Sequence, residues 1–126
     1  MRKFTHAVFA LILGGGALAL VFAYGDIPPL IPQVPPLLDS VLFAGLCLVA
    51  VMAGARLPDL IEPGINRGHR GLFHSKGMAF LLIGCMVILM FLYSRLGFYS
   101  PILIMLCLGY VSHLFLDGLP FGKLPD

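Results

Sequence analysis

One stretch separates the two apolar halves of the chain: RLPDLIEPGINRGHRGLFHSK, residues 56–76. It holds four of the eight Lys and Arg residues, two of the six Asp and Glu residues, and two of the four histidines. The runs on either side are nearly uncharged, so polar chemistry has few other places to occur. The stretch is therefore predicted to be a polar loop, and a function is sought there first.

The composition is typical of a membrane protein. Of the 126 residues, 60% are hydrophobic and 11% are charged, and the mean hydropathy is +1.01. Soluble domains carry about a quarter charged residues, so the deficit indicates a lipid-facing surface. The length fits one integral membrane domain, residues 1–126. The net charge of +2 is too small to indicate a nucleic-acid partner.

Four apolar runs predict an all-α, four-helix transmembrane bundle. An α-helix of about 20 residues crosses a hydrocarbon core of roughly 30 Å. The connector Asp26–Pro36 contains five prolines and is predicted to be extended, because proline removes a backbone donor and disfavours helix in the preceding residue. For the same reason the second run is predicted to end before Pro58. The expected helices are residues 4–24, 37–55, 77–96 and 101–117.

The first run also has features of a secretory signal peptide. Arg2 and Lys3 precede it, and Val21-Phe22-Ala23 near its end resembles a cleavage site. The run is longer than the roughly 7–15 apolar residues of a signal peptide. We therefore expect it to be retained as the first transmembrane helix.

The basic residues predict how the bundle lies in the membrane. With four spans, both termini and the polar loop share one side, and the other side carries only Arg95. By the positive-inside rule, the termini and the loop are predicted to be cytoplasmic, in an inner-membrane protein. The basic residues on the cytoplasmic side are Arg2, Lys3, Arg56, Arg67, Arg70, Lys76 and Lys123.

This topology also gathers the histidines and most acids at the cytoplasmic end. None of them was used to choose the orientation, so their convergence is an independent signal. Side chains of these types can bind a metal ion. The residues are His6, Asp59, Glu62, His69, His74, His113 and Asp117.

The pair His113 and Asp117 is spaced i, i+4, so both side chains project from one helix face. His113 lies about 18 Å along the helix from Pro101, inside the hydrocarbon or at its edge. An ionisable group at that depth needs a partner. Two partners remain open: a metal ion, since zinc takes imidazole nitrogen and carboxylate oxygen, or a His–Asp hydrogen bond that pins the helix to the loop.

The loop histidines, His69 and His74, are five residues apart. They can converge if the glycines of the loop form a turn and His74 opens the third helix, with Ser75 as its cap. Otherwise both histidines are solvated.

The remaining loop charges also have two interpretations. Arg67 and Arg70 are topology anchors or forked guanidiniums that bind a phosphate group. Asp59 is a metal ligand or the partner of an arginine. Glu62 is predicted to be an exposed loop charge.

Taken in order, four segments resemble one known family. They are His6, LPD at 57–59, HRGLFHS at 69–75 and GYVSHLFLD at 109–117. Their combination resembles the YdjM family, small membrane-bound proteins that are predicted metal-dependent hydrolases and are grouped with the zinc-dependent phospholipase C superfamily. The resemblance implies six metal ligands: His6, Asp59, His69, His74, His113 and Asp117.

The chain departs from the family pattern at two places. The family commonly has a second acid soon after LPD, where this chain has Leu60-Ile61 and an acid one position later, Glu62. The family also tends to have a threonine soon after the last Asp, where this chain has Gly118-Leu119-Pro120.

These residues predict a metal-dependent hydrolase at the cytoplasmic membrane face, with one or two divalent ions and zinc as the first choice. A bound ion would lower the pKa of water. Asp59 or Glu62 would act as general base, and Arg67 and Arg70 would neutralise a phosphoryl oxygen. The predicted partner is membrane lipid, and the predicted substrate is a phospholipid or another amphiphilic phosphoester.

The alternative function is structural. In a non-enzymatic membrane protein, the same His/Asp cluster would tie the loop to the helices, with or without a metal ion. A metal transporter is disfavoured, because carriers place their sites near the midplane, and these candidates all lie near one surface.

Overall fold

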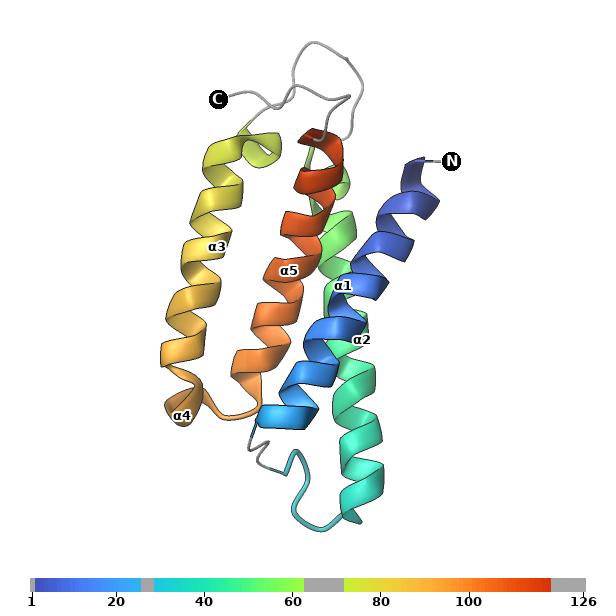
Figure 1. Cartoon of the computed structure of the whole chain (residues 1–126), viewed down its shortest axis with the longest axis vertical. Helices are drawn as coiled ribbons and strands as arrows, with labels where there is room; N and C mark the ends of the chain where they lie inside the picture. The colour runs from blue at the N-terminus through green and yellow to red at the C-terminus, as the bar shows by residue number, and fades with distance from the viewer. Residues whose placement is uncertain (1, 26–28, 63–71, 119–126) are drawn as a thin grey trace.

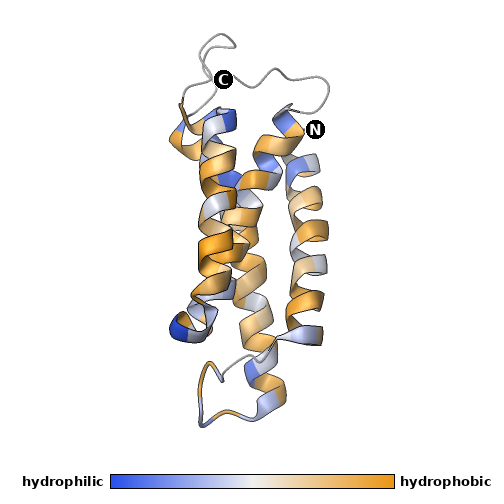
Figure 2. Ribbon diagram, turned by 60° about the vertical axis from the view of Figure 1, so that its left-hand side comes forward, coloured by the Kyte–Doolittle hydropathy of each residue, from blue (hydrophilic) through white to orange (hydrophobic). Residues whose placement is uncertain are grey.

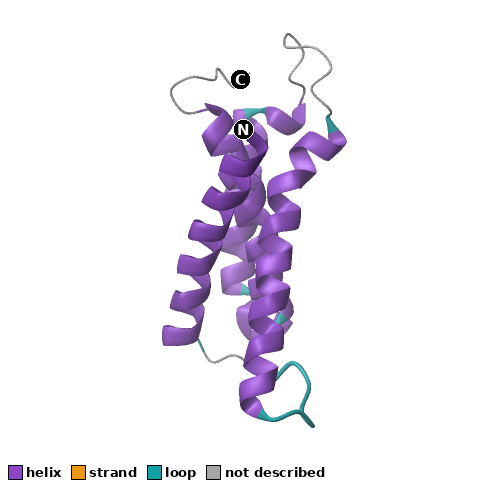
Figure 3. Cartoon of the chain, turned by 90° about the vertical axis from the view of Figure 1, so that its right-hand side faces the viewer, coloured by secondary structure: helices purple, strands orange, loops and turns teal. Residues whose placement is uncertain are grey.

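The computed structural model describes residues 2–25, 29–62 and 72–118. These residues form helices and short connections and contain no strand, which confirms the all-α prediction for this part of the chain (Figure 3). The elements are α1 (Arg2–Tyr24), α2 (Pro36–Ile61), the 3-10 helix η1 (Leu72–His74), α3 (Lys76–Phe91), α4 (Tyr93–Leu96) and α5 (Tyr99–Gly118).

Three helices are long and apolar enough to cross a membrane. They cover Phe4–Tyr24, Pro36–Ile61 and Tyr99–Gly118. Hydrophobic residues line the middle of these helices, and hydrophilic residues lie mainly at the two ends of the molecule (Figure 2). The helix α3 is also apolar but has only 16 residues. Three of the four predicted membrane spans are therefore identified by length and composition.

The helices run side by side (Figure 1). The start of α1, the end of α2, η1 and the end of α5 lie together at one end of the molecule. The helix α3 begins at that end, runs beside α5 and returns the chain to the opposite end, where α4 and the connector between α1 and α2 lie. We call the end that holds η1 the polar end.

The closest packing is between α2 and α5, and two glycines permit it. A Cβ atom on Gly54 would lie 2.0 Å from Leu106 O, and one on Gly109 would lie 2.0 Å from Val51 O. Only hydrogen fits in these gaps, so the two backbones touch directly, as small residues allow in membrane helices. Around this contact, Phe43, Cys47, Val51 and Met105 form the buried core.

The end of α2 differs from the prediction. The helix continues beyond residue 55 through Pro58 to Ile61, so Asp59 lies on a helix and not in a loop. Pro58 leaves Gly54 O without its helical donor, but the proline ring is fully buried in the bundle. The hydrogen bond from Glu62 N to Pro58 O, at 2.9 Å, closes the last turn. Burial of the ring therefore outweighs the local preference of proline to end the helix.

The predicted third helix, residues 77–96, is divided in two. α3 ends at Phe91, and α4 follows after Leu92. Gly97 then takes a positive φ of 56°, a conformation that glycine adopts at little cost, and α5 starts at Tyr99, earlier than predicted. Pro101 lies in the first turn of α5, where helical N–H groups have no partner in any case.

The connector before α2 is not extended over its described part. Val34 N donates to Ile31 O at 3.0 Å and closes a turn. The buried Asp39 carboxylate accepts hydrogen bonds from Leu30 N at 2.9 Å and Ile31 N at 2.8 Å. This acid therefore holds the turn against the start of α2, a constraint that the proline pattern does not reveal.

The glycine contact gives a first testable prediction. Gly109→Ala should lower the stability of the bundle by about 3 kcal/mol, the upper range for overpacking, because the new methyl group meets backbone atoms that cannot rotate away. Thermal unfolding of the detergent-purified protein measures the effect. Gly84→Ala is the matched control, since a Cβ there meets nothing within 4 Å. Equal melting temperatures for the two variants would show that the α2–α5 contact does not limit stability.

Candidate metal centre

Five polar side chains converge at the polar end of the bundle. They come from four elements that are distant in sequence, and two of the histidines, His74 and His113, are buried. Two groups of three could each hold a metal ion, with ligand atoms within 4.8 Å of one another. The five residues, which we call the His/Asp cluster, are His6 from α1, Asp59 from α2, His74 from η1, and His113 and Asp117 from α5.

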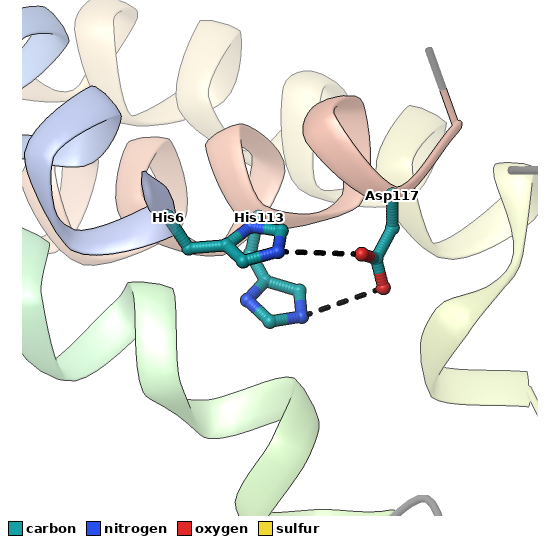
Figure 4. A group of neighbouring side chains, drawn as sticks. All are labelled: His6, His113 and Asp117. Atoms are coloured by element: carbon teal, nitrogen blue, oxygen red, sulfur yellow. Dashed lines mark ion pairs between the residues drawn. The ribbon is translucent and has the colours of Figure 1, made fainter. Parts of the chain in front are cut away.

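In the first group, one carboxylate faces two imidazoles. His6 Nε2 lies 3.4 Å from Asp117 Oδ1, and His113 Nε2 lies 3.7 Å from Asp117 Oδ2 (Figure 4). The two rings are stacked, with centroids 4.3 Å apart and an interplanar angle of 22°. The predicted i, i+4 pair on α5 is therefore joined by the histidine at the start of α1.

The second group shares His113 with the first. Asp59 Oδ1 lies 3.4 Å from His113 Nε2 and 3.7 Å from His74 Nε2. The rings of His74 and His113 meet edge to face, with centroids 5.7 Å apart. His113 is thus the centre of the cluster, and both carboxylates approach the same nitrogen atom.

Hydrogen bonds from the surrounding elements hold His74 in place. His74 Nδ1 lies 3.2 Å from Glu62 Oε2, the distance of a hydrogen bond in which the imidazole N–H donates to the carboxylate. The lone pair of the neutral ring is then on Nε2, which faces Asp59. Metal-binding histidines commonly have a second partner of this kind. Glu62 is therefore not the exposed loop charge that was predicted, because the extension of α2 brings it to His74.

The short helix η1 is itself anchored to its neighbours. The Tyr110 hydroxyl on α5 donates to Phe73 O at 3.0 Å. Ser75 caps α3, as predicted, by accepting from Met78 N at 3.2 Å, and its hydroxyl donates to Leu72 O at 2.6 Å. These bonds fix the backbone on both sides of His74.

The donor atoms of the cluster fit a divalent cation better than a set of direct hydrogen bonds. Three buried nitrogens have no hydrogen-bond partner among the described residues: His6 Nδ1, His113 Nδ1 and His113 Nε2. A buried polar atom without a partner costs about 1–3 kcal/mol. The His–Asp separations of 3.4–3.7 Å exceed the roughly 2.7–2.9 Å of a charge-assisted hydrogen bond.

The same separations suit tetrahedral coordination. Ligands that are about 2.0–2.1 Å from a zinc ion lie about 3.3 Å from one another. The residues around His113 could therefore hold a metal ion.

A cavity of about 340 Å³ opens beside the cluster. Its polar lining consists of His6, Asp59, His113 and Arg56, and apolar residues of α1 and α2 complete it. The Asp59 side chain is 46% exposed, whereas that of His113 is 2% exposed. The cluster is thus accessible to a small molecule on the side where Asp59 lies.

Three predicted site residues, Arg67, His69 and Arg70, lie outside the described residues. Two further residues of the site were not predicted from the sequence. Arg56 lines the cavity, and Tyr110 anchors η1. A signal existed for both, since Arg56 precedes Asp59 by three residues and Tyr110 precedes His113 by three. For Arg56 this three-residue spacing indicates a shared helix face only if α2 continues through Pro58, which the sequence did not predict.

The fold and the site together define a class: a small all-helical membrane protein with a His/Asp cluster at one end. A family model described as YdjM inner membrane protein matches residues 1–122. The chain belongs to the YdjM inner membrane protein family, which confirms this part of the prediction and places it among inner-membrane proteins. The match includes all five residues of the cluster. No curated protein and no solved structure matches the chain.

The anchoring of η1 gives a second prediction. Tyr110→Phe removes the hydrogen bond to Phe73 O and should cost about 1 kcal/mol. The loss should appear as faster hydrogen exchange in peptides that cover residues 72–78, measured by mass spectrometry. Tyr99→Phe is the control, because this ring is exposed at the opposite end. If both variants exchange at the wild-type rate, the tyrosine does not position His74.

Proposed function

We propose that the protein is a metal-dependent hydrolase whose site lies at the cytoplasmic face of the inner membrane. One observation carries the proposal: the buried His113, with neither ring nitrogen hydrogen-bonded, faces two carboxylates beside an open cavity. Membership of an inner-membrane family and three apolar helices support the location.

The orientation is part of this proposal. Seven of the eight basic residues belong to the half of the topology that contains the cluster. Because α3 returns the chain from the polar end to the opposite end (Figure 1), we assign the remaining crossing, the third in chain order, to α3 and α4. The polar end then faces the cytoplasm by the positive-inside rule.

The ligands of the proposed metal come from His6, Asp59, His74, His113 and Asp117; a catalytic zinc ion takes three protein ligands and keeps a fourth position for water. Neutral imidazole nitrogen and carboxylate oxygen are ligands that zinc prefers. Both groups use His113 Nε2, and an imidazole nitrogen has a single lone pair, so the described ligands support one ion rather than two. When bound, zinc supplies Lewis acidity and lowers the pKa of water.

The acids of the site have different proposed roles. Glu62 is a positioning residue, because its carboxylate orients His74. Asp59 lines the cavity and is half exposed, so it is the proposed acceptor of the proton from the attacking water. Arg67 and Arg70 remain proposed phosphate-binding residues. The proposed substrate is a phospholipid headgroup ester or another amphiphilic phosphoester, because the cluster lies where membrane-spanning helices end.

The metal content of the protein tests the first half of this proposal. The detergent-purified wild type should contain about one zinc ion per chain, measured by elemental mass spectrometry. His113→Ala should remove the ion, because both ligand groups lose their shared member. Glu62→Gln should weaken metal binding by about 10–100-fold, since it replaces the charged partner of a ligand by a neutral one and leaves the ligand itself in place.

Asp39→Asn is the control for these variants. It disturbs a buried carboxylate at the opposite end of the bundle, so it should retain the metal even if it melts earlier. Wild-type protein without a stoichiometric transition metal, together with an unchanged metal content in His113→Ala, would sink the proposal.

Turnover tests the second half and separates it from the structural alternative. Zinc-loaded protein should release water-soluble phosphorus compounds from phospholipid vesicles, and Glu62→Gln should reduce the rate by about 10–100-fold. Phosphate analysis of the aqueous phase provides the measurement. If the ion is present, His74→Ala lowers the melting temperature and no phosphoester is cleaved, the cluster is a structural staple and not an active site.

A further inference from the structure

A second hollow lies on α2, next to the cavity beside the His/Asp cluster. The second hollow has a volume of about 410 Å³ and is lined by Leu48, Val49, Met52, Ala53 and Arg56. Met52 and Arg56 line both hollows. We call the second hollow the α2 groove. The α2 groove is apolar along most of its length and ends at Arg56, which also lines the cavity beside the cluster.

The α2 groove lies on the outside of a membrane-spanning helix. Val49 is 67% exposed, and α2 is one of the three candidate spans. From Leu48 to Arg56 the helix rises about 12 Å, so the groove leads from the interior of the membrane toward its surface. In a bilayer, an apolar hollow at this depth would face acyl chains.

Arg56 supplies the positive charge at the polar end of the α2 groove. It makes no ion pair within the described part of the chain, not even with Asp59 three residues later. Its planar guanidinium can bind two phosphate oxygens at once, and its aliphatic stem can lie along apolar residues while the charge reaches the headgroup layer. An arginine at the end of a span is therefore at the depth of lipid phosphates.

We propose that Arg56 and the α2 groove form the binding site of one phospholipid, which enters sideways from the bilayer. The phosphate lies between Arg56 and the His/Asp cluster, and one acyl chain follows Leu48, Val49 and Met52. The lipid thus reaches the cluster without leaving the membrane. Cleavage of the lipid rests on the proposed hydrolase reaction, whereas its binding rests on the groove, on Arg56 and on the metal ion of the proposed function.

Binding of long-chain phosphatidic acid to the zinc-loaded protein tests the site. We expect the detergent-solubilised wild type to bind this lipid more tightly than diacylglycerol, which lacks the phosphate, in titrations followed by native mass spectrometry. Arg56→Gln should weaken binding of phosphatidic acid by about tenfold or more and leave binding of diacylglycerol unchanged. Its zinc content should equal that of the wild type, because Arg56 is not a ligand.

Two controls isolate the charge and the groove. Arg95→Gln removes an exposed arginine at the opposite end and should leave binding unchanged. Ala53→Trp fills the groove and should weaken binding of both lipids, whereas Leu81→Trp on the exposed face of α3 should not. Inorganic phosphate should not compete with phosphatidic acid at equal concentration, because it cannot occupy the groove.

The outcomes separate this inference from the proposed reaction. If phosphatidic acid binds equally well to the wild type and to Arg56→Gln, or if inorganic phosphate competes as effectively as the lipid, the lipid site is overturned and the hydrolase proposal is untouched. If Arg56→Gln loses the lipid while the wild type cleaves no phosphoester, the lipid site stands and the hydrolase proposal fails.

Discussion

The direct backbone contact between α2 and α5 is the constraint on which the rest of the structure depends. At Gly54 and Gly109 the two helices are so close that a methyl group has no room on either side. A contact of this kind fixes the separation of the helices and also their register, since a shift along the axis brings larger side chains between them. Asp59 and His113 each lie about one turn further along their helices. The distance of 3.4 Å between Asp59 Oδ1 and His113 Nε2 therefore depends on the glycine contact, although neither glycine belongs to the site.

The other parts of the cluster are added to this rigid pair. The short helix η1 is held by Tyr110 and Glu62, one from each member of the pair, so His74 depends on both helices. The helix α1 crosses them and places His6 flat against His113 (Figures 1 and 4). A polar centre in an apolar protein needs such support, because every unpaired buried atom is costly. The imidazole Nε2 atoms face the carboxylates of Asp59 and Asp117, an arrangement that could hold a metal ion.

The sequence was sufficient to predict the helices and the residue types of the site, because both follow from local rules. Apolar run length predicts membrane helices, and i, i+4 spacing places His113 and Asp117 on one face. The errors arose where tertiary packing outweighs those rules. Proline is expected to end a helix, yet Pro58 is buried and α2 continues to Ile61. Arg56 and Asp59 therefore lie on the helix, and Glu62 caps its end, whereas all three were predicted to lie in a loop. The turn before α2 likewise could not be predicted from the prolines, because it is held by the Asp39 carboxylate, which lies beyond them in the sequence.

The contact between His6 and Asp117 joins the first helix of the bundle to the last. Ribosomes make α1 long before α5, and chains begin to fold from the N-terminus during synthesis. His6 on α1 therefore has no contact with Asp117 until α5 has been synthesised. A partly made chain without α5 has neither group of the His/Asp cluster, because both contain His113. The cluster can therefore form only in a chain long enough to include α5.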